Sequence, residues 1–222
     1  MQLTTLEAPL LGATTTLLVD DDGSCVLVDV GGGIVPALTA LVEREGWRPV
    51  AILATHGHAD HIWSAAELCA RWQVPLHLHE ADEYRLDDPI GSLGPLGAQL
   101  VAMSGLEAPA RPDDVRPFAL APGQQLELEL GGGPLVRALH LPGHTEGSTV
   151  YLVDGPTMLA GDILFAGSIG RTDLPGGDTQ AMAMTLAHLA SMDPGWRVVP
   201  GHGPHTTLGA EQRTNPYLRS LR

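Results

Sequence analysis

Short apolar runs and polar turns alternate along this chain, a pattern typical of proteins built from many strands and a few helices. Glycine, proline and aspartate bound most of the apolar runs, as they do where strands end. The Asp-Asp-Gly turn at 21–23 predicts that the first two runs form a hairpin. The pattern predicts strands at 14–20, 24–30, 50–54, 75–79, 125–130, 135–141, 148–153, 157–160 and 197–199.

Helical spacing of apolar residues appears in three places between these strands. The first predicted helix has Pro36 in its first turn, where the missing N–H costs nothing, and Gly46 suits its C-terminal end. Asp178 is a typical N-terminal cap for the last helix. The helices are predicted to follow the glycine triplet 31–33, to span 62–72, and to run from Asp178 to about residue 192.

Residues 87–122 separate two strand-rich halves of the chain. This stretch is rich in Gly and Pro and shows little periodicity, so we expect a long, partly ordered excursion there. Two strand-rich halves flanked by helices favour one sheet packed on another, with the helices outside. The 222 residues fit a single domain that covers 1–222 and is large enough to bury a substantial core.

Composition and charge restrict the partners of the protein. Hydrophobic residues make up 44% and charged residues 17% of the chain, which excludes a disordered protein. With 26 acidic against 12 basic residues, the net charge is −14. Such a surface repels nucleic acids and anionic membranes, so we expect neither as a partner. The sequence makes no prediction of an oligomeric state.

Targeting features and cysteines favour a cytoplasmic protein. No apolar run reaches 18 residues, and the first twelve residues lack the basic and apolar segments of a signal peptide. Cys25 lies in a predicted strand and Cys69 in a predicted helix, which indicates two buried thiols in a reducing compartment.

Three histidines and an aspartate crowd into residues 56–61, directly after a predicted strand. Ligand sites of α/β folds lie at the carboxyl ends of strands. His56 and His58 alternate, so an extended backbone points both side chains the same way. Asp60 and His61 come where the chain turns into a helix, so they can face a second position nearby. Imidazole and carboxylate groups are ligands of divalent metals such as Zn²⁺ and Fe²⁺, and this spacing suits two ions side by side.

Three later segments repeat one arrangement, in which an apolar strand ends in a metal-ligating residue type beside glycine. Glycine permits close backbone approach and unusual dihedral angles at such strand exits. The segments are 141–145 with His144, 159–162 with Asp162, and 199–203 with His202. Together with the first cluster they supply five histidines and two aspartates, enough for two coordination shells.

The ordered series HxHxDH, Gly-His, Gly-Asp and Gly-His resembles the metallo-β-lactamase-fold superfamily of metallohydrolases over residues 14–205. The resemblance implies an α/β fold, an αββα sandwich of two mixed β-sheets flanked by helices, with the site in a cleft between the sheet edges. It also implies two divalent ions, Zn²⁺ and/or Fe²⁺, with Mn²⁺ also acceptable. Of the implied ligands, His56, His58 and His144 hold one ion, Asp60, His61 and His202 hold the other, and Asp162 bridges them.

Within that superfamily, the runs 164–173 and 201–217 resemble the glyoxalase II-like branch, and most closely its short bacterial hydroxyacylglutathione hydrolase-like proteins. Those proteins lack the C-terminal helical domain with which larger enzymes hold glutathione, and we expect no such domain here. Arg171 matches a basic position that contacts glutathione in the larger enzymes, whereas Asp173 replaces their aromatic residue. The resemblance implies a small-molecule thioester substrate, such as the glutathione conjugate S-lactoylglutathione.

This site predicts the chemistry of a thioester hydrolase. A hydroxide between two metal ions is a strong nucleophile at neutral pH, because metal binding lowers the pKa of water from about 16 toward 7. Asp60 is expected to orient it and accept its proton, while the ions stabilise the oxyanion. A thiolate, with a pKa near 8.5, departs without a strong acid. Asp29, at the end of a predicted strand, is expected either to hydrogen-bond a ligand imidazole or to cap the strand end.

Three alternatives differ in reaction or class. Persulfide dioxygenases of the same superfamily share a Gly-Arg-Thr-Asp segment like that at 170–173, and they use one iron held by the equivalents of His56, His144 and Asp162. A non-catalytic metal-binding module would saturate its metal with protein ligands, whereas this set leaves room for water. A serine hydrolase is disfavoured because 166–170 departs from Gly-x-Ser-x-Gly at its first position.

Overall fold

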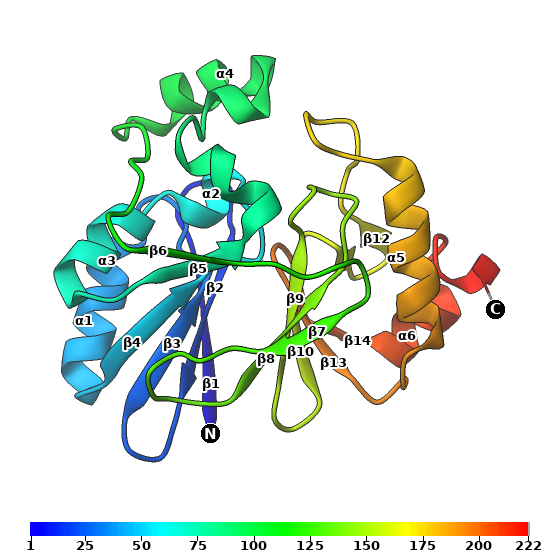
Figure 1. Ribbon diagram of the computed structural model, residues 1–222, viewed down its shortest axis with the longest axis horizontal. Coiled ribbons are helices and arrows are strands. Elements are labelled where there is room, and N and C mark those ends of the chain that lie inside the picture. Colours follow the sequence, from blue (N-terminus) through cyan, green and yellow to red (C-terminus); the bar gives the residue numbers. More distant parts are fainter. Residues whose placement is uncertain (222) are drawn as a thin grey trace.

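A computed structural model describes residues 1–221 and arranges them as two six-stranded β-sheets packed face to face, with helices outside (Figure 1). In the first sheet, the first three strands are antiparallel neighbours and the remaining neighbours are parallel. Its order is β1 (Gln2–Glu7), β2 (Thr14–Val19), β3 (Ser24–Val28), β4 (Arg48–Leu53), β5 (Leu76–His79) and β6 (Val115–Phe118).

The second sheet is mixed as well. Its neighbours β10 and β13 are parallel and its other neighbours are antiparallel. A small hairpin of β11 (Leu164–Phe165) and β12 (Ser168–Ile169) lies beside it. The order of the sheet is β14 (Thr206–Thr207), β13 (Arg197–Pro200), β10 (Thr157–Gly161), β9 (Thr149–Val153), β8 (Val136–His140) and β7 (Gln125–Glu127).

The helices form two outer layers and a group at one end of the sheets. In Figure 1, α1 (Val35–Glu45) and α3 (Ala65–Trp72) flank the first sheet, and α5 (Thr179–Ser191) and α6 (Leu208–Thr214) flank the second. The predicted αββα sandwich of two mixed sheets is thereby confirmed. The other helices are α2 (Ala59–Ile62), η1 (Glu80–Leu86), η2 (Gly91–Leu93), α4 (Pro95–Ser104) and η3 (Arg219–Leu221). Within residues 1–221, no helix combines the length and apolar character needed to cross a membrane.

Alternate residues of the central strands serve two apolar layers, because successive side chains of a strand point to opposite faces. Leu17 and Ile52 belong to the layer between the first sheet and its helices, whereas Leu18 and Leu53 pack with Tyr151 between the sheets. The third layer lies under α5, where Met182, Leu186 and Leu189 are buried as their helical spacing indicates. The two thiols, Cys25 and Cys69, are free and buried, as predicted.

The predicted continuous helix at 62–72 is wrong at its start. The structure has two helices, α2 and α3, which are separated at Trp63 and Ser64. Ser64 makes two hydrogen bonds to the loop after β3: its N–H donates to the Val30 carbonyl (3.0 Å) and its hydroxyl to the Gly31 carbonyl (2.6 Å). These long-range bonds anchor the interruption, which local periodicity does not reveal.

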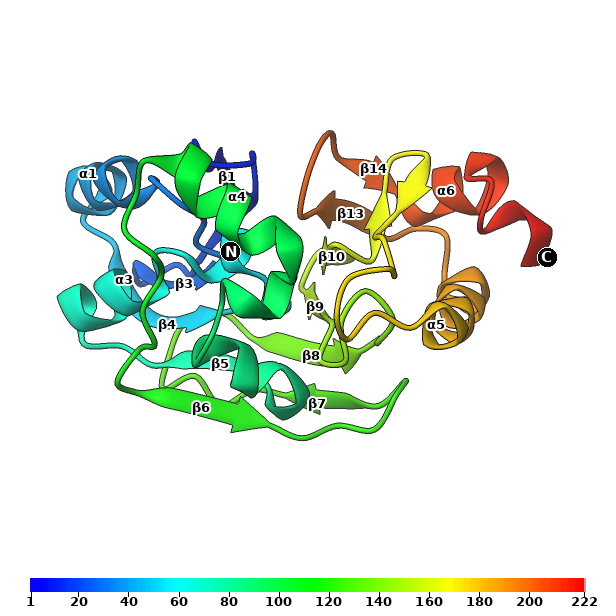
Figure 2. The same ribbon diagram turned by 90° about the horizontal axis from the view of Figure 1, so that it is seen from above.

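The segment 87–122 is more regular than its composition indicates. It contains strand β6, which pairs in parallel with β5 at the edge of the first sheet. It also contains helix α4, where Leu100 packs with Leu93 against Ala59 and Trp63. Figure 1 shows α4 at the same end of the first sheet as α2, the helix that follows β4, and Figure 2 views the molecule from above, with α4 toward the viewer. An apolar contact with α2 therefore orders this part of the excursion.

Candidate metal centre

The seven predicted ligands converge at one end of the two sheets. Four strands deliver them, and each ligand follows the carboxyl end of its strand, as predicted. The strand–ligand pairs are β4 with 56–61, β8 with His144, β10 with Asp162, and β13 with His202. This end is marked by α2 in Figure 1.

The first group of ligand atoms comes from three buried histidines. His58 Nδ1 lies 3.1 Å from His56 Nε2 and 2.9 Å from His144 Nε2. The rings are 4.6–4.8 Å apart between centroids and nearly perpendicular, so three nitrogen atoms face one point. This geometry brings together two segments that are 86 positions apart in the sequence.

The second group contains the other two histidines and Asp60. His202 Nε2 lies 3.3 Å from His61 Nε2 and 3.2 Å from Asp60 Oδ2. His61 Nε2 is in turn 3.7 Å from Asp60 Oδ2. His61 is fully buried, whereas His202 is partly exposed, so this group is the one more open to solvent.

Asp162 lies between the two groups. Its Oδ1 is 3.3 Å from His61 Nε2, and its Oδ2 is 3.7 Å from both His144 Nε2 and His202 Nε2. The position needs glycine at Gly201, because a Cβ there would overlap Asp162 Oδ1 and lie 2.8 Å from the His61 ring. The predicted close approach of glycine to the centre is therefore present at this strand exit.

Hydrogen bonds outside the cluster fix which ring nitrogen of each ligand faces inward. His144 Nδ1 donates to the Arg171 carbonyl at 2.7 Å, and His61 Nδ1 donates to Asp29 Oδ2 at 2.9 Å. Each ring therefore turns its Nε2 toward the cluster. His56 Nδ1 lies 3.1 Å from the Thr55 hydroxyl oxygen, whose proton is donated to Asp29. Such outer partners hold metal-ligating histidines in one tautomer.

This donor set fits divalent cations. His144 and His56 each use the Nδ1 proton outside the cluster, so the inward Nε2 atom is the one that can offer a lone pair to a metal ion. Both lone pairs meet at His58 Nδ1, which can donate at most one proton. Asp162 Oδ1 is buried and accepts no hydrogen bond from the described residues. A cation between these atoms satisfies all of them at once.

The electrostatics of the two groups differ. Burial lowers the pKa of His56 well below its ordinary value and that of His58 to about 3, so both rings are neutral. Burial also opposes charge on His61, but Asp162, Asp60 and Asp29 raise the pKa of its ring well above the ordinary range. Burial raises the pKa of Asp60, but His61 and His202 lower it, and the net result is a pKa well below the ordinary value. The second group thus favours positive charge at its centre.

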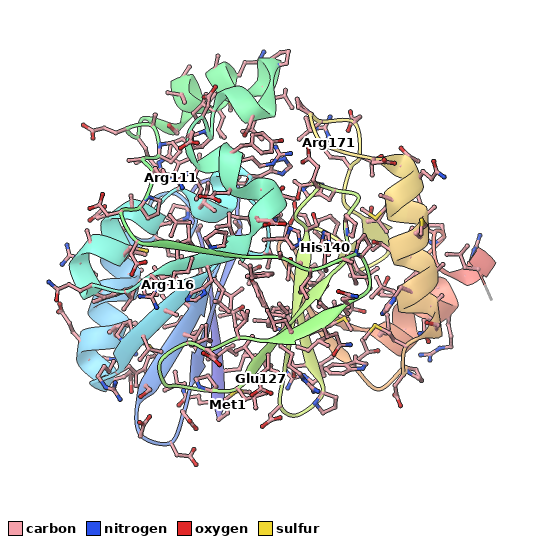
Figure 3. All side chains as sticks on the ribbon, in the orientation of Figure 1. Met1, Arg111, Arg116, Glu127, His140 and Arg171 are labelled. Carbon is pink, nitrogen blue, oxygen red and sulfur yellow. The ribbon has the colours of Figure 1, made fainter. Side chains whose placement is uncertain are left out.

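Two further predicted site residues lie outside the ligand groups. Asp29 accepts hydrogen bonds from His61 and from the N–H and hydroxyl of Thr55. Arg171, labelled in Figure 3, is exposed, and its guanidinium donates to both carboxylate oxygens of Asp173 at 2.7 Å. Its backbone carbonyl, rather than its side chain, contacts a ligand histidine.

The sequence prediction missed Asp82, a fully buried residue of η1. Its carboxylate accepts hydrogen bonds from Gly57 N (2.8 Å), Gly147 N (2.9 Å) and the Thr145 hydroxyl (2.7 Å), and it pairs with buried Arg85 at 3.3 Å. One carboxylate therefore ties the loop of the first two histidines to the loop of the third. The sequence feature that could have identified Asp82 is its position just after the carboxyl end of a predicted strand, where the predicted ligands also lie.

A model of the metallo-beta-lactamase superfamily matches residues 9–202, a range that contains all seven predicted ligands. The chain belongs to this superfamily. Proteins of the metallo-beta-lactamase superfamily bind divalent metals and are mostly enzymes, and the clustered histidines and aspartates give this chain a candidate site of that kind.

Relatives align over nearly the whole chain. An uncharacterised protein of Mycobacterium tuberculosis is 38% identical, with 100% of this chain and 99% of that protein covered. The probable metallo-hydrolase YqgX of Bacillus subtilis is 35% identical over 94% of this chain and 93% of its own length. Hydroxyacylglutathione hydrolase GloC of Haemophilus influenzae is 33% identical, with 92% of each chain covered.

Several solved structures superpose closely on this chain. TTHA1623 in a di-iron-bound form is 38% identical, with a TM-score of 0.80 over 98% of this chain and 100% of that chain. The B3 metallo-beta-lactamase BLEG-1 is 30% identical, with a TM-score of 0.81 over 98% and 99%. ETHE1 from Myxococcus xanthus, at 23% identity and a TM-score of 0.73 over 97% and 84%, shares the fold.

Proposed function

We propose that this protein is a metal-dependent hydrolase of the glyoxalase II-like branch that cleaves small-molecule thioesters such as S-lactoylglutathione. His56, His58 and His144 would hold one divalent ion, and Asp60, His61 and His202 the other. Asp162 would bridge the two ions. Zn²⁺ and Fe²⁺ are the ions proposed, with Mn²⁺ also compatible with imidazole and carboxylate ligands.

The observation that carries this proposal is the position of Asp162. One of its oxygens is turned to His61 and the other to His144 and His202, so a single carboxylate borders both ligand groups. A shared carboxylate is suited to two cations about 3.5–4 Å apart. The di-iron form of TTHA1623, at 38% identity, adds support for two ions in this site.

The residues of the chain can position the reacting groups. Divalent ions, when bound, would lower the pKa of a water molecule and polarise a substrate carbonyl. Asp60 is ionised, since its pKa is lowered by His61 and His202, and its Oδ2 borders the second ligand group. It would accept the proton of the attacking water and hold that water in line with the substrate.

The leaving group favours a thioester. Apart from the metal-site residues, Arg171 is the titratable side chain that lines the pocket above the ligands. A guanidinium does not serve as an acid near neutral pH, so a leaving group that needs no protonation fits this pocket best. A thiolate, with a pKa near 8.5, meets that requirement. The name of the relative GloC, a hydroxyacylglutathione hydrolase, points to the same bond.

A mononuclear persulfide dioxygenase is the second candidate, with iron held by His56, His144 and Asp162. Two observations make it secondary. The relative GloC, named a hydroxyacylglutathione hydrolase, is 33% identical to this chain. The run 167–178 also resembles the hydrolase-like proteins more closely.

An activity panel with protein of known metal content separates the two reactions. Protein loaded with Zn²⁺ or Fe²⁺ should release thiol from S-lactoylglutathione or a related acylglutathione, detected with a thiol reagent, without consuming oxygen. The matched inactive control is Asp60→Asn, which is expected to lose most of the thiol release. Oxygen uptake with glutathione persulfide, in the absence of thioester cleavage, would instead assign the dioxygenase reaction.

A further inference from the structure

A pocket of about 310 Å³ opens above the ligand groups, and its walls are mainly apolar. Its floor includes four ligand residues: His58, Asp60, His144 and Asp162. Six aliphatic or thioether side chains make most of the wall: Leu11, Leu93, Leu96, Leu100, Met103 and Leu174. A substrate whose carbonyl reaches the floor must therefore place its acyl group against apolar side chains.

Helix α4 supplies one continuous face of this wall. Leu96, Leu100 and Met103 follow the spacing i, i+4 and i+7, so they lie on the same side of the helix. Leu100 also packs with Trp63, which anchors the helix near α2. Leu96 is 41% and Met103 83% exposed, so two large apolar side chains are left open to whatever enters the pocket.

The charge of the wall is already balanced. Arg171 is the cation that lines the pocket, and its Nε and Nη2 atoms donate to the two carboxylate oxygens of Asp173 at 2.7 Å. Gln99, the remaining polar wall residue, is uncharged. A carboxylate on the acyl group would meet a guanidinium whose charge is already paired with that of Asp173. Apart from Gln99, the aliphatic and thioether side chains of the wall offer a hydroxyl on the acyl group no hydrogen-bond partner. The wall therefore discriminates in favour of apolar acyl groups.

We infer that, among the thioesters covered by the proposed function, the protein prefers those with an unsubstituted aliphatic acyl chain, which lies along the Leu96–Met103 face of α4. This inference rests on the proposed thioester hydrolysis and specifies the acyl group. The driving force is the removal of methylene groups and of the exposed α4 side chains from water. A small polar acyl group such as lactoyl would leave this face uncovered.

A series of acylglutathiones tests the inference with the thiol carrier held constant. The kcat/KM of the metal-loaded protein is measured for the S-acetyl, S-butyryl, S-hexanoyl and S-lactoyl compounds. Each methylene that is buried should raise kcat/KM roughly threefold to fourfold. The hexanoyl compound has four more methylenes than the acetyl compound, so it should exceed it by about 80-fold or more if all four are buried and by about tenfold if two are. Equal values along the series, or a preference for lactoyl, would overturn the inference while leaving thioester hydrolysis in place.

Two matched methionine variants locate the effect on α4. Met103→Gln replaces a wall residue, whereas Met184→Gln changes an exposed methionine of α5, 67% exposed, that does not line this pocket. The hexanoyl-to-acetyl ratio of kcat/KM should fall at least threefold in M103Q and stay at the wild-type value in M184Q. An unchanged ratio in M103Q would refute the placement of the chain on α4. If wild-type protein cleaves none of the thioesters, the proposed function itself fails, and the inference fails with it.

Discussion

His61 donates a hydrogen bond from Nδ1 to Asp29 Oδ2 at 2.9 Å, so a carboxylate at the end of β3 orients a histidine that follows β4. The backbone of Asp29 has a φ of +56°, in a region that residues other than glycine rarely adopt. This conformation coincides with three hydrogen bonds to the carboxylate, since Thr55 donates both its N–H and its hydroxyl. The backbone at the end of β3 thus places the Asp29 carboxylate, and this carboxylate orients the His61 ring so that Nε2 faces the ligand group.

The first prediction concerns Asp29→Asn. In asparagine an N–H₂ replaces one oxygen and faces either the Thr55 N–H or both the Thr55 hydroxyl and His61 Nδ1. Either arrangement breaks the hydrogen-bond network that holds the His61 ring in one tautomer. We expect the affinity for divalent metal to fall by about 10–100-fold, measured by competition with a chromophoric chelator. Asp154→Asn, in an exposed turn, is the control and should bind metal as the wild type does. Wild-type affinity in D29N, with an intact circular dichroism spectrum, would contradict the role given to Asp29.

The second prediction concerns the buried pair of Asp82 and Arg85. Asp82→Asn removes one of the two carboxylates that face the buried guanidinium of Arg85, the other being that of Glu146, and it replaces an acceptor oxygen with a donor. Breaking a buried ion pair on one side typically costs about 3–5 kcal/mol. We therefore expect the free energy of unfolding in urea to fall by about 3 kcal/mol, and metal affinity to fall with it.

An exposed ion pair provides the comparison for that measurement. Glu67 and Arg71 form an i,i+4 pair on α3 with a separation of 3.8 Å. Glu67→Gln should change the free energy of unfolding by less than about 0.5 kcal/mol. Equal effects of D82N and E67Q would show that Asp82 does not tie the two histidine loops together.

Local chemistry made much of the fold predictable. The hairpin of β2 and β3 follows from its turn, and α1 ends at Gly46, whose φ is +67°. Asp178 caps α5 as predicted, because its side chain accepts from the N–H groups of Gln180 and Ala181. In each case the signal lies within a few residues of the element that it specifies.

Elements held by distant contacts were not predictable in this way. Helix α4 has apolar residues on nearly all sides and contains Gly97, so its sequence lacks the periodicity that predicts a helix. Packing on Trp63 stabilises it. Strand β1, at Gln2–Glu7, gains its order by pairing with β2. The ligand residue types were visible in the sequence, but the hydrogen bonds of Asp82 join segments more than 60 positions apart.

The third prediction concerns the two thiols. Burial raises the pKa of Cys25 and of Cys69 from 9.0 to about 12. Because the thiolate is the reactive form, neither thiol should react with a disulfide reagent at about pH 8 in the native protein. Both should react in guanidinium chloride. Rapid labelling of either thiol under native conditions would refute the burial of that side chain.

The same shifts predict a loss of stability in alkali. Between about pH 9 and pH 12 the unfolded chain releases thiol protons that the folded chain retains. The free energy of unfolding should therefore fall as the pH rises through this window. In a Cys25→Ala variant the free energy of unfolding should fall less per pH unit than it does in the wild type. An equal pH dependence in the variant would show that Cys25 ionises normally in the folded protein.

Counting metal ions tests the central claim most directly. Metal-stripped protein is saturated with Zn²⁺ or Fe²⁺, freed of excess ion and analysed for metal per chain. Two ligand groups that share Asp162 predict two ions per chain in the wild type, and one in a His202→Ala variant that retains the His56, His58 and His144 group. One ion per saturated wild-type chain, or equal content in the wild type and the variant, would contradict the account.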